Sequence, residues 1–146
     1  MKTLALGLIS IFTLLQAGAA EVQWMTDLPK AQAKAKSEKK MVMLDFTGSD
    51  WCGWCIKLNK EVFSTPEFVE YAAKNLVPVE IDFPSKKQQT PELKKANKAL
   101  QEKYKVQGYP TIIVLNSEGK QVGELGYMPG GPKAFIAELE KLKGKS

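Results

Sequence analysis

Short apolar runs alternate with longer stretches of helical pattern along most of the chain. The apolar runs at residues 41–46 and 76–83 are long enough for buried strands and too short for helices. Residues 111–116 and 121–127 flank the sequence SEG, which is typical of a β-hairpin. The pattern therefore predicts four strands, the last two of them joined by a tight turn.

Helix start signals lie between these strands and before them. A helix is expected over residues 26–40, and another from about Cys52. A third helix follows Ser64 and Thr65, either of which can cap it, and Glu67 stands at capping-box spacing from Ser64. Three helices are thus expected before the second half of the chain.

Two amphipathic helices complete the predicted elements, one over residues 90–106 and one over residues 130–143. The apolar stripe of the first consists of Leu93, Ala96, Leu100 and Tyr104. The inward face of the second consists of Phe135, Leu139 and Leu142. Strands separated by helices imply parallel crossovers, and the hairpin adds antiparallel pairing. The predicted fold class is α/β, with a central mixed β-sheet flanked by helices on both faces.

The first 20 residues follow a different pattern. Lys2 precedes an apolar stretch from Leu4 to Leu15 and small residues that satisfy the A-x-A rule. This order predicts a cleavable signal peptide over residues 1–20, followed by one domain over residues 21–146. An uncleaved anchor is the alternative, although the apolar stretch is shorter than the ~20 residues that a membrane span needs. We therefore expect a periplasmic or secreted protein, in an oxidising compartment.

The positive charge of the chain does not indicate a nucleic-acid partner. The 146 residues carry a formal net charge of +5, and every basic residue is a lysine. Recognition of phosphates and bases usually requires arginine forks and a concentrated basic face, whereas these lysines are spread along exposed helical faces. With 44% hydrophobic and 25% charged residues, the composition is that of a soluble globular protein, which we expect to be a monomer.

Both cysteines of the chain lie in SDWCGWCIKL, residues 49–58. A structural zinc site needs four ligands, which two cysteines and no histidine cannot supply without carboxylates or a second chain, so no metal or other cofactor is expected. A bridge that closes so short a loop stabilises by only roughly 2 kcal/mol before strain is subtracted. The favoured interpretation is a redox pair: Cys52 at a helix N-terminus attacks as the thiolate, and Cys55, one turn later, resolves the mixed disulfide.

The residues between the cysteines indicate what kind of redox centre this is. A partly buried helix N-terminus stabilises a thiolate by at most ~2 kcal/mol, which lowers the pKa of a free thiol from about 8.5 to roughly 7. Gly53 and Trp54 add neither a cation nor an imidazole. A moderately acidic thiol and a reductase-like or intermediate potential are therefore expected.

Several landmarks occur in the order found in the thioredoxin family: MLDF and WCGWCIKL, then VEIDF, then VQGYPTIIVLNSEGK, then the C-terminal helix. Residues 40–143 thus resemble that family, and in particular the small exported Dsb-type disulfide oxidoreductases of bacteria. The resemblance implies a thioredoxin fold, a cis peptide bond before Pro110, and pairing of the Tyr109 backbone with an extended substrate. It also implies that Asp45 shuttles the proton of the second cysteine.

The chain departs from the family pattern at several positions. Asp45 precedes Cys52 by seven residues instead of the usual six, which leaves open whether its carboxylate reaches the second cysteine. Pro78 stands near the place where thioredoxins carry a strand lysine that pairs with this acid, and Trp54 replaces the usual proline. An insertion around residues 84–100 enlarges the rim of the site.

These features predict an exported thiol–disulfide oxidoreductase that reduces or isomerises protein disulfides. Trp51 and Trp54 are expected to form an apolar docking surface for protein chains, with core packing as the alternative for Trp51. A separate thiol donor, for which a membrane protein is the first candidate, is needed to reduce the cysteine pair again. The alternatives are a non-catalytic thioredoxin-fold binding or chaperone module, and a dedicated electron-relay partner of one periplasmic protein.

Overall fold

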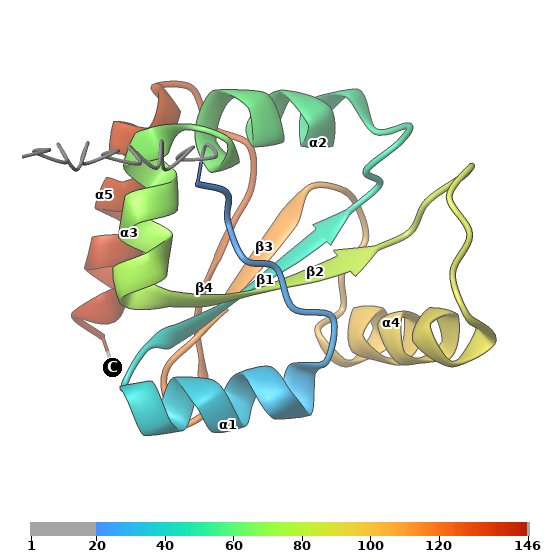
Figure 1. Cartoon of the computed structure of the whole chain (residues 1–146), viewed down its shortest axis with the longest axis horizontal. Coiled ribbons are helices and arrows are strands. Elements are labelled where there is room, and N and C mark those ends of the chain that lie inside the picture. Colours follow the sequence, from blue (N-terminus) through green and yellow to red (C-terminus); the bar gives the residue numbers. More distant parts are fainter. Residues whose placement is uncertain (1–19, 146) are drawn as a thin grey trace, which may run out of the picture.

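A four-stranded mixed sheet, in the order β2-β1-β3-β4, forms the centre of the molecule (Figure 1). The computed structural model describes residues 20–145. Helices cover both faces of the sheet, so the predicted fold class is confirmed. Apart from Ala20, the predicted signal peptide lies outside the described residues.

The strands lie close to the predicted ranges, with β1 in the interior of the sheet. β1 pairs in parallel with β2 and antiparallel with β3, which forms an antiparallel hairpin with β4. All residues of β1 are buried, as expected of a strand with neighbours on both sides. The strands are β1 (Met41–Thr47), β2 (Leu76–Asp82), β3 (Thr111–Leu115) and β4 (Gln121–Leu125).

The helices form two layers, each packed on its own hydrophobic cluster (Figure 1). One layer holds α1 (Leu28–Glu38) and α4 (Pro91–Lys103). The other holds α2 (Gly53–Leu58), its continuation as the π-helix η1 (Asn59–Phe63), α3 (Pro66–Asn75) and α5 (Gly131–Lys143). Because the side chains of a strand alternate, successive residues of β1 face opposite layers.

The helix caps agree with the sequence signals except at α3. The Thr65 hydroxyl accepts the backbone N–H of Phe68, so Thr65 is the N-cap and not Ser64. Pro66 favours this start, because a proline suits the first helical position and makes the residue before it the cap. Glu67 therefore lies one residue too early for a capping box, and that detail of the prediction is wrong.

The buried face of α4 also differs from the predicted stripe. Ala96 is exposed, and Asn97 is the buried residue of this helix. The Asn97 amide donates to the backbone oxygen of Asp82 at 3.0 Å, so a polar side chain satisfies a carbonyl at the end of β2. Residues Phe135, Leu139 and Leu142 of α5 are buried, as predicted.

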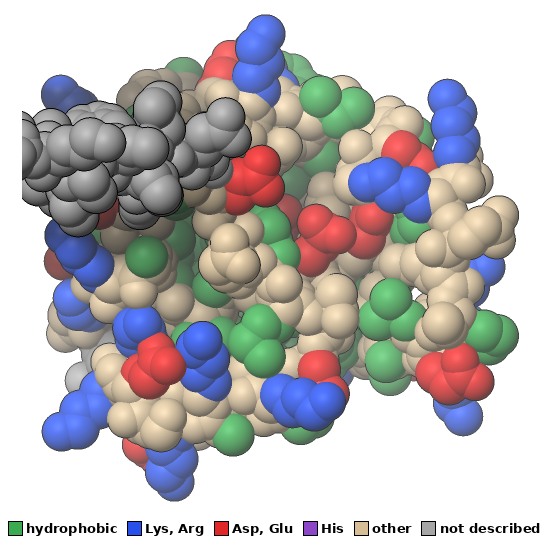
Figure 2. All heavy atoms as spheres, in the orientation of Figure 1, with side chains coloured by type: hydrophobic (Ala, Val, Ile, Leu, Met, Phe, Trp, Pro, Cys, Tyr) green, Lys and Arg blue, Asp and Glu red, His purple; other side chains and the backbone are tan. Residues whose placement is uncertain are grey.

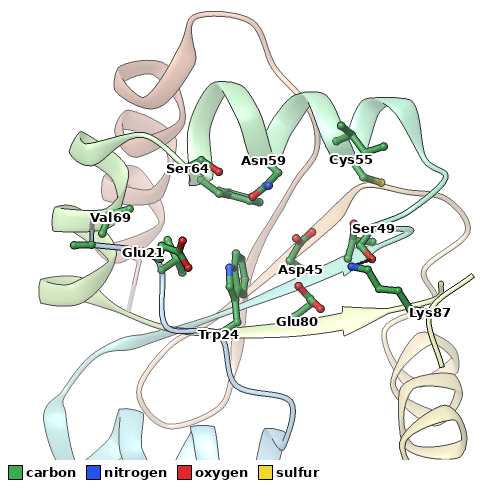
Figure 3. Close-up of a pocket in the computed structure, with 15 residues that line it drawn as sticks. Glu21, Trp24, Asp45, Ser49, Cys55, Asn59, Ser64, Val69, Glu80 and Lys87 are labelled. Atoms are coloured by element: carbon green, nitrogen blue, oxygen red, sulfur yellow. Dashed lines mark hydrogen bonds between the residues drawn. The ribbon is translucent and has the colours of Figure 1, made fainter. Parts of the chain in front are cut away.

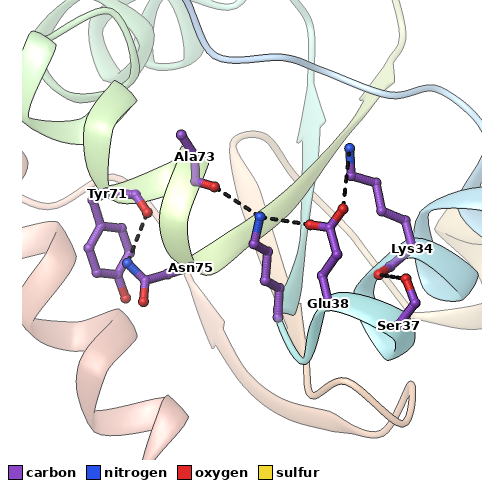
Figure 4. A network of polar contacts seen from close by, with 7 residues as sticks. Lys34, Ser37, Glu38, Tyr71, Ala73 and Asn75 are labelled. Atoms are coloured by element: carbon purple, nitrogen blue, oxygen red, sulfur yellow. Dashed lines mark hydrogen bonds and ion pairs between the residues drawn. The ribbon is translucent and has the colours of Figure 1, made fainter.

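Lys40 joins the two helical layers at the start of β1 through contacts with Ala73 and Glu38, both labelled in Figure 4. Its ammonium group donates to the backbone oxygen of Ala73 in α3 at 2.9 Å and lies 2.7 Å from the carboxylate of Glu38 in α1. This contact ties the α1–β1 connection to the last turn of α3.

The segment before α1 runs along the outer edge of β2. Met25 forms an isolated parallel bridge with Val79, exchanging hydrogen bonds with the backbone of Pro78 and Glu80 at 2.9 and 2.8 Å. The Trp24 ring packs 5.5 Å from that of Phe63 in η1. The segment thus covers part of an edge that would otherwise be unpaired. Within residues 20–145, no helix has the length and apolar character needed to cross a membrane.

Candidate active site

Cys52 and Cys55 form a disulfide at the start of α2, with their Cα atoms 5.2 Å apart. Cys52 is the N-cap of this helix, and its sulfur accepts the backbone N–H of Cys55 at 3.3 Å. Both residues are nearly buried, with exposed fractions of 7% and 5%. The first sulfur therefore lies at the helix N-terminus, where the free N–H groups favour a thiolate.

A tight turn before Cys52 accommodates the extra residue of this segment. The backbone N–H groups of Trp51 and Cys52 both donate to the oxygen of Gly48, at 3.2 and 2.8 Å. The Trp51 ring folds back over this turn, and a Cβ at position 48 would lie 2.5 Å from it. Gly48 is therefore the residue that lets the ring pack here.

Trp51 lies on one side of the disulfide, in an aromatic group with Phe83 and Tyr109. Its indole N–H donates to the backbone oxygen of Phe83 at 2.7 Å, and its ring meets that of Tyr109 edge-on at 6.0 Å. Tyr109 in turn stacks on Phe83 at 5.2 Å. Trp51 is 51% exposed, so it is a surface residue held in place by its neighbours and not part of the core.

Trp54 lies between the two cysteines in the sequence, and its side chain is 57% exposed. Its ring lies 4.9 Å from that of Tyr127, and the Lys57 ammonium lies 5.1 Å from each of the two rings. The Tyr127 hydroxyl donates to the carboxylate of Glu61 at 2.7 Å. These contacts hold a second aromatic group, Trp54 and Tyr127, in place. Of these two residues, only Trp54 was predicted from the sequence.

The peptide bond between Tyr109 and Pro110 is cis, as the resemblance implied. The Tyr109 hydroxyl accepts the side-chain amide of Gln101 from α4 at 2.8 Å. The hydrogen bond joins the loop before β3 to α4, and the contact with Trp51 joins it to the loop before α2.

A cavity of about 520 Å³ lies between the sheet and α2 (Figure 3). Cys55 and Asp45 both line it, so the carboxyl group and the second cysteine face the same space despite their unusual spacing. Figure 3 shows Asp45 between Glu80 on the sheet side and Asn59 on the helix side. In Figure 2, acidic side chains gather at the hollow between α2 and β2, with a basic side chain beside them.

Asp45 is a buried acid with 7% exposure. Its neighbours across the sheet are Ile112 in β3 and Glu80 in β2. Burial raises the pKa of Asp45 to about 8, and the negative charges of Glu80 and Asp82 act in the same direction. The oxygen Oδ1 has no hydrogen-bond partner within residues 20–145. Near neutral pH this group therefore holds a proton beside the buried sulfur.

Glu80 was not identified from the sequence. Pro78 was expected near the position that faces the acid, but the register places Pro78 opposite Met43 and Glu80 opposite Asp45. Burial, followed by the charge of Asp82, raises the pKa of Glu80, while Lys87 lowers it. Only the parallel register of β1 and β2 could have revealed the pair, since Glu80 alone is an ordinary polar residue of a half-buried strand.

The residues just before Trp51 bind the end of β2 and the loop that follows it. The Asp82 carboxylate accepts both the backbone N–H and the hydroxyl of Ser49. Lys87 donates to the same hydroxyl at 2.9 Å. The Asp50 carboxylate accepts the backbone N–H groups of Ser85, Lys86 and Lys87, at 2.7–2.9 Å. The segment before Trp51 and the loop after β2 thus form together the rim that the insertion around residues 84–100 predicts.

No group of three or more His, Cys, Asp or Glu side chains in the described part of the chain is arranged to hold a metal ion. Among residues 20–145, the two sulfurs of the Cys52–Cys55 bond are the redox-active atoms of the site, and Asp45 lines the same cavity as Cys55.

A family model described as a thioredoxin-like domain matches residues 28–143, nearly the whole described chain. This chain belongs to the thioredoxin-like family. The thioredoxin fold accounts for the mixed sheet, the helix that begins at the cysteine pair and the cis peptide bond before β3.

Solved structures and curated proteins agree with this membership. A structure called DsbH oxidoreductase superposes with a TM-score of 0.79 at 38% identity, over 85% of each chain. A thioredoxin from Thermus thermophilus superposes with a TM-score of 0.63 at 26% identity, over 84% of this chain and 87% of that one. The disulfide bond reductase DsbH of Chlamydia pneumoniae is 38% identical over 84% of this chain and 73% of its own length.

Two further relatives are much longer than this chain. The thioredoxin-related protein DsbJ of Chlamydia pneumoniae is 32% identical over 72% of this chain, which spans 30% of that protein. The thiol:disulfide interchange protein DsbD of Klebsiella pneumoniae is 34% identical over 81% of this chain, which spans 18% of that protein. The chain thus corresponds to one portion of each.

Proposed function

We propose that this protein is a thiol–disulfide oxidoreductase that reduces or isomerises protein disulfides in the periplasm or outside the cell. The observation that carries the proposal is the Cys52–Cys55 disulfide at the N-terminus of α2 in a thioredoxin-like domain. The similarity to a relative called a disulfide bond reductase supports it. The apolar stretch and A-x-A sequence at the start of the chain support export.

In the first step, the Cys52 thiolate of the reduced protein attacks one sulfur of a substrate disulfide. A bond forms between Cys52 and that sulfur, the substrate disulfide breaks, and its other sulfur leaves as a thiolate. The N–H groups at the start of α2 stabilise the attacking thiolate. The product of this step is a mixed disulfide between Cys52 and the substrate.

In the second step, Cys55 attacks Cys52 and releases the substrate. The Cys55 thiol first gives its proton to Asp45, which faces the same cavity and accepts the proton in its ionised form, the minor form at neutral pH when the pKa is about 8. The resulting thiolate forms the Cys52–Cys55 bond, and the second substrate sulfur leaves as a thiolate. Two electrons pass to the substrate, and the protein ends in the disulfide state that the structure contains. Proton transfer is efficient because the raised pKa of Asp45 is close to that of a thiol.

The substrate chain binds beside the disulfide. Trp51 and Trp54 offer half-exposed aromatic surface at this place, and each is held by neighbouring rings. The backbone of Tyr109, before the cis Pro110, supplies hydrogen bonds to an extended peptide. Rigid aromatic rings bind at a small cost in conformational entropy, which suits recognition of unfolded segments.

Insulin reduction with dithiothreitol tests the mechanism. Cys52→Ser is expected to abolish the activity, because no nucleophile remains at the helix terminus. Cys55→Ser is expected to accumulate a mixed disulfide that non-reducing electrophoresis detects. Full activity of the Cys52→Ser protein would contradict the proposed function.

The direction of electron flow is tested by equilibrating the cysteine pair with a glutathione redox buffer. We expect a potential on the reductase side, near roughly −270 mV, and a value near roughly −120 mV would instead make the protein an oxidant. A reductase in an oxidising compartment needs a thiol donor. A membrane-bound thiol:disulfide interchange protein is our candidate, since relatives with that name share this domain.

A binding or chaperone module is the second candidate function, favoured by the two half-exposed tryptophans. It predicts that a variant with both cysteines replaced by alanine still protects an unfolded protein from aggregation. If this variant loses both its disulfide exchange and its protection of the unfolded protein, the result contradicts the binding module and favours the oxidoreductase function.

A further inference from the structure

Two carboxyl groups lie side by side in the wall of the cavity next to Cys55. Asp45 and Glu80 are direct partners in the parallel pairing of β1 and β2, so their side chains extend from the same face of the sheet. Both line the cavity, and Figure 3 shows them next to each other under α2. Neither forms an ion pair with a neighbouring cation within the described residues at the distances typical of salt bridges.

The Asp45 carboxyl is directed into this cavity with one oxygen unsatisfied. Oδ1 has no hydrogen-bond partner among residues 20–145, although the residue is more than nine-tenths buried. A buried polar atom without a partner is costly, and polar cavities of this size hold water that satisfies such atoms. The cavity extends from Cys55 to Glu80 and Lys87, so it offers a route between the buried sulfur and solvent.

We propose that Glu80 is a positioning residue for proton transfer at Cys55: it forms with Asp45 a carboxylate pair that takes up one proton from the second cysteine. This inference rests on the proposed function and adds to it a residue that acts through Asp45. Glu80 does not touch the sulfurs. Its role is to raise, through its negative charge, the affinity of Asp45 for the proton of Cys55.

The physical reason is that two adjacent carboxylates cannot both ionise without mutual repulsion. With both groups ionised this repulsion raises the affinity of Asp45 for a proton, so Asp45 accepts the proton that Cys55 gives up, and the pair changes from two negative charges to one. The proton then leaves through the cavity, past Glu80, and the pair is ready for the next cycle. Because the two groups titrate together, the pair has two apparent pKa values that belong to both residues.

Other charged groups around the pair act from each neighbouring element. Asp82 in β2 adds negative charge, as does Glu21 of the segment before α1, which also lines the cavity. Lys87, from the loop after β2, is the cation that faces Glu80. From α2 and η1 the cavity is lined by Cys55, Ile56, Asn59 and Phe63, none of which carries a charge in the disulfide state. Ile112 is the apolar neighbour in β3.

The test is the pH titration of the Asp45 carboxyl carbon by NMR in the oxidised protein, where no thiol titrates. Glu80→Gln keeps the shape of the side chain and removes its charge. We expect the Asp45 midpoint to move to lower pH by about one to two units, as for the loss of a like charge at close range. Glu124→Gln, on the exposed face of β4, is the matched control and leaves the midpoint unchanged. Asp45→Asn identifies the resonance.

A second measurement follows resolution of the mixed disulfide by the reduced protein in single turnovers. The pH profile of this step is expected to shift in Glu80→Gln in the same direction as the Asp45 midpoint, and Glu80→Asp restores it at least in part. An Asp45 midpoint that Glu80→Gln leaves unchanged overturns the carboxylate pair. Should Glu80→Gln not fold, the same titration of Glu80→Asp decides, since a shorter side chain moves the charge and must move the midpoint. Failure of the wild-type protein to reduce insulin contradicts the proposed function instead, and the titration does not depend on it.

Discussion

Asp45 lies in the middle of the sheet, where an ionised carboxylate is poorly solvated. Its neighbours are an isoleucine on one side and a second acid on the other, and the pKa of Asp45 is raised to about 8 mainly by burial. A group of this kind opposes folding whenever it is charged. Its presence in a fully buried strand fits a role in chemistry and not in stability.

Asp45→Asn is expected to stabilise the oxidised protein at pH 8 and to change little at pH 4. The folded protein keeps the Asp45 proton up to about pH 8. The unfolded chain releases this proton near pH ~4, so between these values the unfolded state binds fewer protons and stability falls as the pH rises. The asparagine variant lacks this pH dependence, so its free energy of unfolding is expected to exceed that of the wild-type protein by about 2–5 kcal/mol at pH 8. Urea unfolding of both proteins from pH 4 to 9 measures this difference. A difference that stays constant with pH would contradict the prediction.

Trp54→Ala is expected to raise the KM for insulin about 10-fold, the effect of losing roughly 1.4 kcal/mol of apolar contact. Exchange with oxidised glutathione should stay within about two-fold, since a small disulfide does not need the docking surface. Trp54→Phe, which keeps an aromatic ring against Tyr127, is the control. Equal losses with both substrates would show that Trp54 acts on the sulfur chemistry and not on docking.

At the scale of elements, the connection before α2 and the loop after β2 form one unit. Ser49 binds Asp82, Asp50 binds three successive backbone N–H groups, and Trp51 binds the oxygen of Phe83. The extra residue in the first connection is thus used to hold the second. Since the disulfide and Tyr109 adjoin these loops, the unit keeps the rim of the site in one arrangement.

Asp50→Ala is expected to release the loop at residues 85–87. The backbone N–H groups, first that of Ser85, hold the pKa of Asp50 below its usual range, so the contact persists at neutral pH and is lost only as the pH falls below that range. In the variant, hydrogen exchange of these three amides should be about tenfold faster. Amides of α5 serve as the internal control, and unchanged exchange at residues 85–87 would show that Asp50 does not hold the loop.

On the scale of the whole molecule, the segment before α1 closes one side of the cavity and covers an edge of the sheet. Trp24 lines the cavity and packs on Phe63, while Met25 pairs with β2. A part of the chain far from the cysteines in sequence therefore forms one wall of the cavity that Asp45 faces.

Trp24→Ala is expected to destabilise the protein by about 1–3 kcal/mol through loss of this half-buried contact. It should also lower the Asp45 midpoint, because a wider opening solvates the carboxylate better. Urea unfolding and the NMR titration measure the two effects. Gln23→Ala, at an exposed neighbouring position, is the control and should change neither. A destabilised protein with an unchanged midpoint would mean that Trp24 does not limit access of solvent to the acid.

Local signals in the chain were sufficient for the order of all helices and strands, for most helix starts and for the cysteine pair. Caps, apolar periodicity and turn residues act over a few neighbouring positions, so a single sequence contains them in full. Errors occurred where two local signals competed, as at Ser64 and Thr65, or where a distant partner decided the outcome, as when the Asp82 carbonyl turned Asn97 inward.

Only the tertiary structure decided which groups surround the cysteines. The pairing of Asp45 with Glu80 depends on the register of two strands separated by two helices. The contact of Ser49 with Asp82 spans 33 positions in the chain. Such contacts arise from packing, and the sequence gives no local signal for a partner that far away. The two sulfurs could be named from the sequence, whereas the acid beside Asp45 and the cavity that both acids line required the fold.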